Sequence, residues 1–363
     1  MPYGIEKFIQ PHLSALDGYS AHRSPETLAG KTEVPVTNII KLDANENLYG
    51  CSPGVQKVLG SYIPYNIYPD AGQTELRKAL EKYTGVSFEH LVVGNGSGEL
   101  IDLILQLLVG PGEEVINFVP TFDMYRFRTQ LVNGKLVEVV RNDGFAIDVA
   151  KAKAAVTPKT KLIIMTNPNN PDGSLTPEKD VREILETGVP VLVDEAYYEF
   201  CGETVVPLVG EYENLMVLRT FSKWTGLAGL RVGYGIFPPV IAGYLLKNKL
   251  PYNVNIAAQI AVLESLKDTE YLMGTVRKVI AERERLFGEL QKIAWLAPYP
   301  SRTNFILCSV RSGNAGEIRE RLQAKGLLVR YFNRPLMRGF IRFSVGKPEH
   351  TDALIKGLRE IGG

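Results

Sequence analysis

The stretch KLIIMTNPNNPDG, residues 161–173, shows the pattern that decides the fold. A short apolar run, 161–166, ends abruptly in a cluster of asparagine, proline, aspartate and glycine, which is typical of a strand followed by a loop. Similar runs occur elsewhere, and longer helical patterns such as 74–83, 98–109 and 177–186 separate them. The sequence therefore predicts βαβ units and a mostly parallel sheet, with strands at 91–93, 114–118, 135–140, 161–166, 190–193, 215–219 and 231–236.

Five of these runs end in polar or turn-forming residues, and this is the main functional signal. The clusters that follow them are 94–99, 120–122, 167–173, 194–197 and 220–223. In an open α/β sheet, ligands bind outside the carboxyl ends of the strands. We therefore expect the five clusters to converge on one site.

The two ends of the chain differ from this central part. Residues 1–43 contain Pro11, Pro25 and Pro35 and build no periodic apolar face, which predicts an irregular arm. After residue 250 a long helical pattern, 256–292, precedes shorter strand and helix patterns. The predicted organisation is an arm (1–43), a large domain (44–250) and a smaller α/β C-terminal domain (251–363).

Composition excludes several classes of protein. The 363 residues carry 41 Lys+Arg against 40 Asp+Glu, without the basic excess of a nucleic-acid-binding protein. No apolar run is long enough for a membrane span, and the first residues lack the core of a secretory signal. The three cysteines and four histidines are scattered, which favours reduced thiols and predicts no metal site. A cytoplasmic enzyme is expected.

Several residues have two readings when taken alone. The loop before the helix at 98–109 includes Ser97 and Gly98, and it is either an anion site at a helix N-terminus or an ordinary tight turn. Asp194 and Tyr197 could be a helix cap and a core tyrosine. Lys223 could be a surface lysine. However, hydroxyl groups, glycines and Arg231 surround it in sequence, which suits a phosphate-bearing cofactor tethered through the amine.

An ordered set of motifs covers nearly the whole chain and resembles the fold-type I pyridoxal-phosphate-dependent aminotransferases. Among them it is most similar to the histidinol-phosphate aminotransferase family. The matching motifs are Leu42-Asp-Ala-Asn-Glu-Asn47, Tyr68-Pro69, Ser97, Asn169-Asn170-Pro171-x-Gly173, Asp194-x-x-Tyr197, Ser222-Lys223, Gly226-Leu-Ala-Gly-Leu-Arg231-Val-Gly-Tyr234, Arg330 and Ile341-Arg342-Phe-Ser-Val-Gly346.

The resemblance implies a role for each matching residue around pyridoxal phosphate. It implies that Lys223 bonds to the cofactor and moves the proton, and that Asp194 pairs with the pyridine nitrogen. Tyr197 and Asn170 would hydrogen-bond the ring oxygen, and Phe122 would stack on the ring. The phosphate would be held by Ser97, Gly98, Thr220, Ser222 and Arg231, with Tyr68 reaching over from the other subunit of a homodimer.

Substrate residues follow from the same resemblance. Arg342 and Arg330 are implied to bind the substrate anions, because a guanidinium suits both phosphate and carboxylate. Tyr19 and Asn47 are expected to line the pocket. Strand alternation alone would also allow Arg342 to face solvent. The chain departs from the family pattern at Gly98, Phe122, Asp172 and Trp224-Thr225.

The resemblance implies transamination of L-histidinol phosphate with 2-oxoglutarate in histidine biosynthesis. Three alternatives remain open from the sequence. A threonine-phosphate decarboxylase and an aromatic amino-acid aminotransferase share this fold, and a catalytically silent binding protein could also use it. Intact Lys223, Asp194, Tyr197 and Arg231 argue against the last of these.

Overall fold

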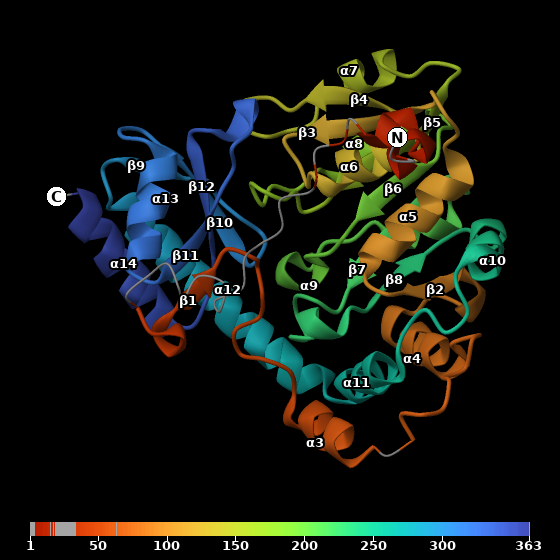
Figure 1. Cartoon of the computed structure of the whole chain (residues 1–363), viewed down its shortest axis with the longest axis horizontal. Helices are drawn as coiled ribbons and strands as arrows, with labels where there is room; N and C mark the ends of the chain where they lie inside the picture. The colour runs from red at the N-terminus through yellow and green to blue at the C-terminus, as the bar shows by residue number, and fades with distance from the viewer. Residues whose placement is uncertain (1–3, 15, 17, 19–33, 63, 363) are drawn as a thin grey trace.

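The computed structural model describes residues 4–14, 16, 18, 34–62 and 64–362. It has two sheets, the larger on one side of the long helix α12 (Thr269–Gln291) and the smaller on the other (Figure 1). Within the described residues no helix combines the length and the apolar character that crossing a bilayer requires. The α/β fold class with a large, mostly parallel sheet is as predicted.

The large sheet has seven strands in the order β2-β8-β7-β6-β5-β3-β4. Only β8 runs antiparallel to its neighbours β2 and β7. The other neighbouring pairs are parallel. The strands are β2 (Leu91–Gly94), β3 (Glu114–Val119), β4 (Lys135–Val140), β5 (Thr160–Thr166), β6 (Val191–Asp194), β7 (Leu215–Thr220) and β8 (Gly233–Ile236).

Helices cover both faces of the large sheet, which is why its central strands read as continuous apolar runs. Alternate residues of a strand point to opposite faces, so Val193 belongs to one core and its neighbour Leu192 to the other. The face of Leu192 packs on α5 (Ser97–Leu108) and α10 (Pro239–Asn248). The opposite face packs on α4 (Thr74–Thr84), α7 (Val149–Ala154), α8 (Glu178–Leu185), α9 (Tyr198–Cys201) and α11 (Ile256–Lys267).

The small sheet has the order β1-β11-β12-β10-β9. Its first strand, β1 (Ile40–Leu42), pairs in parallel with β11 (Leu327–Tyr331), although residues 40–42 lie in the predicted arm. The limits of the arm (1–43), the large domain (44–250) and the small domain (251–363) remain predictions. The other strands are β9 (Leu296–Pro298), β10 (Phe305–Val310) and β12 (Phe340–Ser344). The sheet packs with α12 and α13 (Ala315–Ala324), and α14 (Pro348–Gly362) packs against these two helices.

The predicted strand at 135–140 is confirmed in its bounds, and the other predicted strands of the large sheet differ at their ends. The largest difference is in β8, which begins at Gly233 because Arg231 adopts a left-handed conformation with φ 56°. The predicted helical stretch 256–292 is two helices, α11 and α12. They separate at Asp268, whose ψ of 23° is not helical, and aspartate is favoured at such ends over helix interiors.

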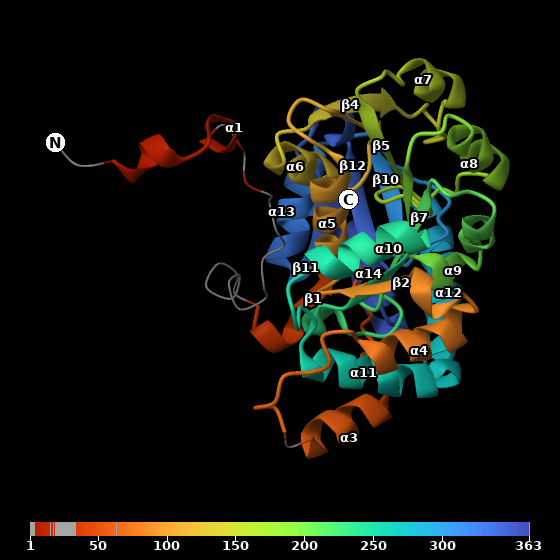
Figure 2. The same ribbon diagram turned by 90° about the vertical axis from the view of Figure 1, so that its right-hand side faces the viewer.

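The described residues also include six helices that the sequence analysis did not predict: α1 (Pro11–Ser14), α3 (Pro53–Ser61), α6 (Met124–Leu131), α7, α9 and α10. In Figure 2, α1 lies at the edge of the molecule, beside α6. His12 Nε2 of α1 is 3.3 Å from the carbonyl oxygen of Leu131, the last residue of α6. Helix α1 therefore contacts α6 of the large domain.

Candidate active site

The carboxyl ends of β2, β3, β5, β6 and β7 lie at the same edge of the large sheet. Because β8 is antiparallel to both β2 and β7, β2 points in the same direction as the parallel strands. The five polar clusters expected to converge therefore follow strands that end on one side. This confirms the predicted arrangement of the strand ends.

Lys223 follows β7 and is half-buried. Its Nζ donates a 3.0 Å hydrogen bond to the carbonyl oxygen of Ala44. Burial, and after it the positive charge of Arg342, lower the pKa of Lys223 to about 7. A lysine whose pKa lies near neutrality is largely uncharged at slightly alkaline pH, so its amine can act as a nucleophile or accept a proton.

The charges around Lys223 are mostly positive. Besides Arg342, both Lys41 and Arg231 lower its pKa, whereas Glu46 raises it. Lys41 also forms an ion pair of 2.6 Å with Glu46. Such a site favours an anionic ligand, because the cations repel one another unless negative charge is brought between them.

Asp194 is the last residue of β6 and is 4% exposed. Its Oδ2 accepts a 2.7 Å hydrogen bond from Tyr125 Oη, and its Oδ1 accepts one of 3.0 Å from the backbone N–H of Ala196. Burial raises the pKa of Asp194, and the hydrogen bond from Tyr125 opposes the rise. The N-cap of α9 is Tyr197, so Asp194 is not the helix cap that the sequence left as an alternative.

Tyr197 and Asn170 lie close together, as the resemblance implied. The Tyr197 hydroxyl oxygen accepts hydrogen bonds from Asn170 Nδ2 at 3.5 Å and from Asn45 Nδ2 at 3.0 Å. Asn45 is held in turn by Ser344 of β12, through its backbone N–H at 2.9 Å. The motif around Asn45 was noticed in the sequence, but its contact with Tyr197 depends on the return of β1 to the small sheet.

Three of the residues proposed for the phosphate are neighbours. Ser222 Oγ accepts bonds from Thr220 Oγ1 at 3.0 Å and from Arg231 Nη1 at 3.4 Å. The glycine loop lies against the same arginine, because a Cβ added at Gly96 (φ 78°) would clash with the guanidinium of Arg231. Ser97 and Gly98 begin α5 directly after this loop. A helix N-terminus, two hydroxyls and a guanidinium therefore come together.

Glu99 shapes the same loop and was missed as a functional candidate. Its Oε2 accepts hydrogen bonds of 2.6 Å from the backbone N–H of Asn95 and from Asn253 Nδ2. The carboxylate thereby joins the loop to the segment before α11. Its position in the first turn of α5 was the available signal.

Strand alternation alone allowed Arg342 to face solvent, but in the structure it is buried. It is 4% exposed, and β12 is buried throughout from Ile341 to Ser344. Its Nη1 donates a 2.5 Å hydrogen bond to Asn170 Oδ1, and its Nη2 donates one of 2.7 Å to the carbonyl oxygen of Asp43. Arg330 lies directly opposite Arg342 in the β11–β12 ladder and is half-buried.

The remaining predicted residues lie at different distances from this centre. Phe122 is half-buried and packs edge-on against Tyr125, with ring centroids 5.6 Å apart. Asn47 Nδ2 donates to the carbonyl oxygen of Trp224 at 2.9 Å, next to Lys223. Tyr68 is 77% exposed and stacks on Tyr252 at 4.5 Å. Tyr19 lies outside the described residues.

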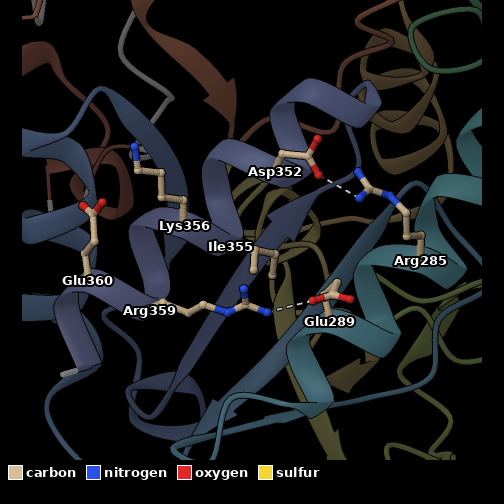
Figure 3. Close-up of a pocket in the computed structure, with 7 residues that line it drawn as sticks. All are labelled: Arg285, Glu289, Asp352, Ile355, Lys356, Arg359 and Glu360. Atoms are coloured by element: carbon tan, nitrogen blue, oxygen red, sulfur yellow. Dashed lines mark hydrogen bonds and ion pairs between the residues drawn. The ribbon is translucent and has the colours of Figure 1, made fainter.

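A surface pocket between α12 and α14 is separate from this site (Figure 3). Two ion pairs cross it, Arg285–Asp352 at 2.7 Å and Arg359–Glu289 at 2.9 Å. These charges neutralise one another within the pocket. We assign no chemistry to it.

Comparison with known proteins identifies the family. The aminotransferase class I and II family matches residues 37–358. A histidinol-phosphate aminotransferase of Dehalococcoides mccartyi is 52% identical over the full length of both chains. A chloroplastic histidinol-phosphate aminotransferase of Arabidopsis thaliana is 45% identical, over 98% of this chain and 86% of its own.

A solved structure is also similar. The histidinol-phosphate aminotransferase of Sinorhizobium meliloti, in complex with pyridoxal-5'-phosphate, superposes with a TM-score of 0.88 at 26% identity. The match covers 98% of this chain and 97% of that one. By sequence and fold, the chain belongs to the class I and II aminotransferase family, within the group of the histidinol-phosphate aminotransferases.

Proposed function

We propose that this chain is a pyridoxal-phosphate-dependent transaminase. It would interconvert L-histidinol phosphate and 2-oxoglutarate with imidazole-acetol phosphate and L-glutamate, a step of histidine biosynthesis. The observation that carries the proposal is the amine of Lys223, whose pKa burial lowers to about 7 among mostly positive charges. The names of its relatives supply the substrate.

The residues present fit pyridoxal phosphate at both of its ends. At the phosphate end, Arg231, Ser222 and Thr220 gather beside the N-terminus of α5, with Ser97 and Gly98 in its first turn. A Cβ would fill the close approach of Gly96 to Arg231. At the ring end the buried Asp194 carboxylate would hold a proton on the pyridine nitrogen. Tyr197 and Asn170 would bind the ring oxygen, and Phe122 would cover a face of the ring.

When bound, pyridoxal phosphate supplies an electron sink for the electron pair left when the Cα–H bond of the substrate breaks. Lys223 would accept that proton and deliver it to the C4′ carbon of the cofactor, because about half of its amine groups are uncharged at pH 7. The hydroxyl of Tyr197, in contact with Asn45 and Asn170, keeps a fixed position beside the ring.

Arg342 and Arg330 would bind the anionic groups of the substrates. One site must take a phosphate in one half-reaction and a carboxylate in the other, and the guanidinium fork suits both geometries. The bonds from Arg342 to Asn170 and to the Asp43 carbonyl orient the fork before substrate arrives. Asn47 and Tyr19 are proposed to line the same pocket.

The proposal includes a homodimer in which Tyr68 reaches the neighbouring site. Its support is the exposure of Tyr68 and its stacking on Tyr252. Tyr252 precedes Asn253, which bonds to Glu99 in the first turn of α5, so this surface lies next to the phosphate end. The proposal also places the reaction in the cytoplasm, where the three unpaired cysteines suit a reducing compartment.

A product assay tests the proposal. Purified protein loaded with pyridoxal phosphate is offered histidinol phosphate, phosphothreonine or phenylalanine, each with 2-oxoglutarate. Glutamate formation with histidinol phosphate as the preferred donor is expected. Release of carbon dioxide from phosphothreonine would identify a lyase instead, and a preference for phenylalanine would identify an aromatic transaminase.

A further inference from the structure

Asp172 departs from the family pattern, and it is buried rather than placed in the substrate pocket. It is 1% exposed. Its Oδ1 accepts a hydrogen bond from Asn169 Nδ2, and its Oδ2 accepts one of 2.8 Å from the backbone N–H of Ser174. The buried guanidinium of Arg141 experiences its negative charge, which favours the charged form of that arginine. The carboxylate therefore has a compensated charge and defined partners.

From Asn169 a continuous chain of hydrogen bonds leads to Asp194. Asn169 Oδ1 lies 2.8 Å from Thr121 Oγ1, which lies 3.1 Å from Thr166 Oγ1. Thr166 Oγ1 lies 3.0 Å from Tyr125 Oη, and Tyr125 donates at 2.7 Å to Asp194 Oδ2. The chain crosses the ends of β3, β5 and β6, which are neighbours in the sheet, and the first turn of α6 (Figure 1).

Asp172 and the Pro120 carbonyl together decide which way this chain can donate. The carboxylate of Asp172 and the carbonyl of Pro120 offer only acceptors, so both bind the amide nitrogen of Asn169. The amide oxygen must then face Thr121, and the Thr121 hydroxyl must donate to it. At the other end, ionised Asp194 needs the hydrogen of Tyr125.

Counting hydrogens shows the consequence. Three hydroxyl groups, on Thr121, Thr166 and Tyr125, supply three hydrogens for the four contacts between Asn169 and Asp194. With Asp194 ionised, the single hydrogen of Thr166 must serve two contacts. A proton on Asp194 would complete the chain, with every donor directed toward Asn169. The fixed amide therefore favours a proton at the Asp194 end.

We propose that Asp172 is a positioning residue for Asp194. By fixing the amide of Asn169 it sets the direction of the Thr121–Thr166–Tyr125 hydroxyl chain and so increases the proton affinity of the Asp194 carboxyl. The groups that also act on Asp194 are Tyr125, Lys223 and Glu195, and Arg141 is the charged group near Asp172. The effect of this proton affinity on catalysis rests on the proposed function, in which the Asp194 carboxyl pairs with the pyridine nitrogen.

The test measures the titration of Asp194 in cofactor-free protein by NMR of ¹³C-labelled aspartate carboxyls. The signal is assigned by its absence in Asp194→Asn. In Asp172→Asn only the Pro120 carbonyl, at 3.1 Å, still requires the nitrogen of Asn169, so the preference for this amide orientation weakens and the chain can reverse more easily. The titration midpoint is expected to fall by about one pH unit, a tenfold loss of proton affinity. Asp143→Asn removes an equal charge from an exposed position and serves as the control.

A second substitution separates the chain from a through-space effect of charge. Thr166→Val preserves the shape of the side chain and removes the central hydroxyl. If coupling runs through the hydroxyls, Asp172→Asn shifts the midpoint much less in the Thr166→Val background than in the wild type. Equal shifts in both backgrounds, or a shift no larger than that of Asp143→Asn, would overturn the proposal.

Activity of the loaded enzyme gives a further measurement. Asp172→Asn should change kcat and its pH profile while KM for both substrates stays within about twofold, since Asp172 is buried away from solvent. If no transaminase activity exists, the proposed function fails, but the NMR titration still decides the coupling. If activity exists without the coupling, only this inference fails.

Discussion

Arg342 and Asn170 join the two sheets through a 2.5 Å hydrogen bond from Nη1 to Oδ1. Arg342 lies on β12 of the small sheet, and Asn170 lies in the loop after β5 of the large sheet. Asn170 also donates to the Tyr197 hydroxyl. A residue proposed to bind substrate is thus connected to the residues proposed to bind the cofactor ring.

Arg342→Lys should impair both half-reactions. A lysine carries the charge but has no planar fork with separate Nη1 and Nη2 donors for Asn170 and the Asp43 carbonyl, so the fork geometry is lost. We expect kcat/KM to fall by the equivalent of about 2–5 kcal/mol with either histidinol phosphate or glutamate, measured in single-turnover half-reactions. Arg338→Lys, at an exposed position, is the matched control. Normal rates in both half-reactions would remove Arg342 from the substrate site.

Arg330→Ala should act mainly on substrate binding. Arg330 lies opposite Arg342 in the ladder and is half-buried, so it can reach a distal anion. KM for the phosphorylated substrate should rise much more than the Kd for pyridoxal phosphate, measured by fluorescence titration. Arg321→Ala, on the exposed side of α13, should change neither quantity. Unchanged KM in Arg330→Ala would contradict the assignment.

Asp194→Asn should reduce turnover strongly. Asparagine keeps the shape but not the charge that would hold a proton on the pyridine nitrogen, and it cannot accept from both Tyr125 and Ala196 with its single oxygen. We expect kcat to fall by the equivalent of several kcal/mol, each 1.36 kcal/mol being about tenfold. A near-normal kcat would leave Asp194 with a structural role only.

The amine of Lys223 should react at unusually low pH in cofactor-free protein. Burial lowers its pKa to about 7, so the reactive neutral amine is lost only as the pH falls below that value. Labelling by an amine-selective reagent, quantified by peptide mass spectrometry, should be half-maximal near pH 7. Lys57, exposed on α3, provides an internal reference for reagent decay. A midpoint above pH 9 would contradict the burial argument.

Stability should depend on pH through Glu199. Burial raises its pKa from 4.5 to about 7, against the opposing effect of Arg219. Because the folded state holds the proton more tightly, the contribution is full below pH 4.5 and is lost as the pH rises through 7. Relative to Glu199→Gln, the wild-type free energy of unfolding should fall by up to about 3 kcal/mol over this window. Denaturant titrations at both ends measure it, and parallel pH profiles for the two proteins would contradict it.

The sequence predicted the parts of the site that local pattern encodes. Asp194 and Lys223 each follow an apolar run, so their position at a strand end could be inferred without contacts. Tyr125 could not be found this way, because it lies inside α6, a short helix that the sequence analysis did not predict, and does not directly follow a strand. The contact of Asn45 with Tyr197 spans 152 residues and needs the pairing of β1 with β11. The burial of Arg342 was missed since alternation assumes one open face, whereas both are covered.

The pairing of β1 with β11 also has a consequence for the order of events during synthesis. Ala44 and Asn45, which contact Lys223 and Tyr197, come early in the chain, but β1 has no partner strand until residues 327–331 exist. The large sheet can form as its strands leave the ribosome, because every strand in it lies between residues 91 and 236. The active centre is therefore the last part to be completed, and a nascent chain holds a folded scaffold without a working site.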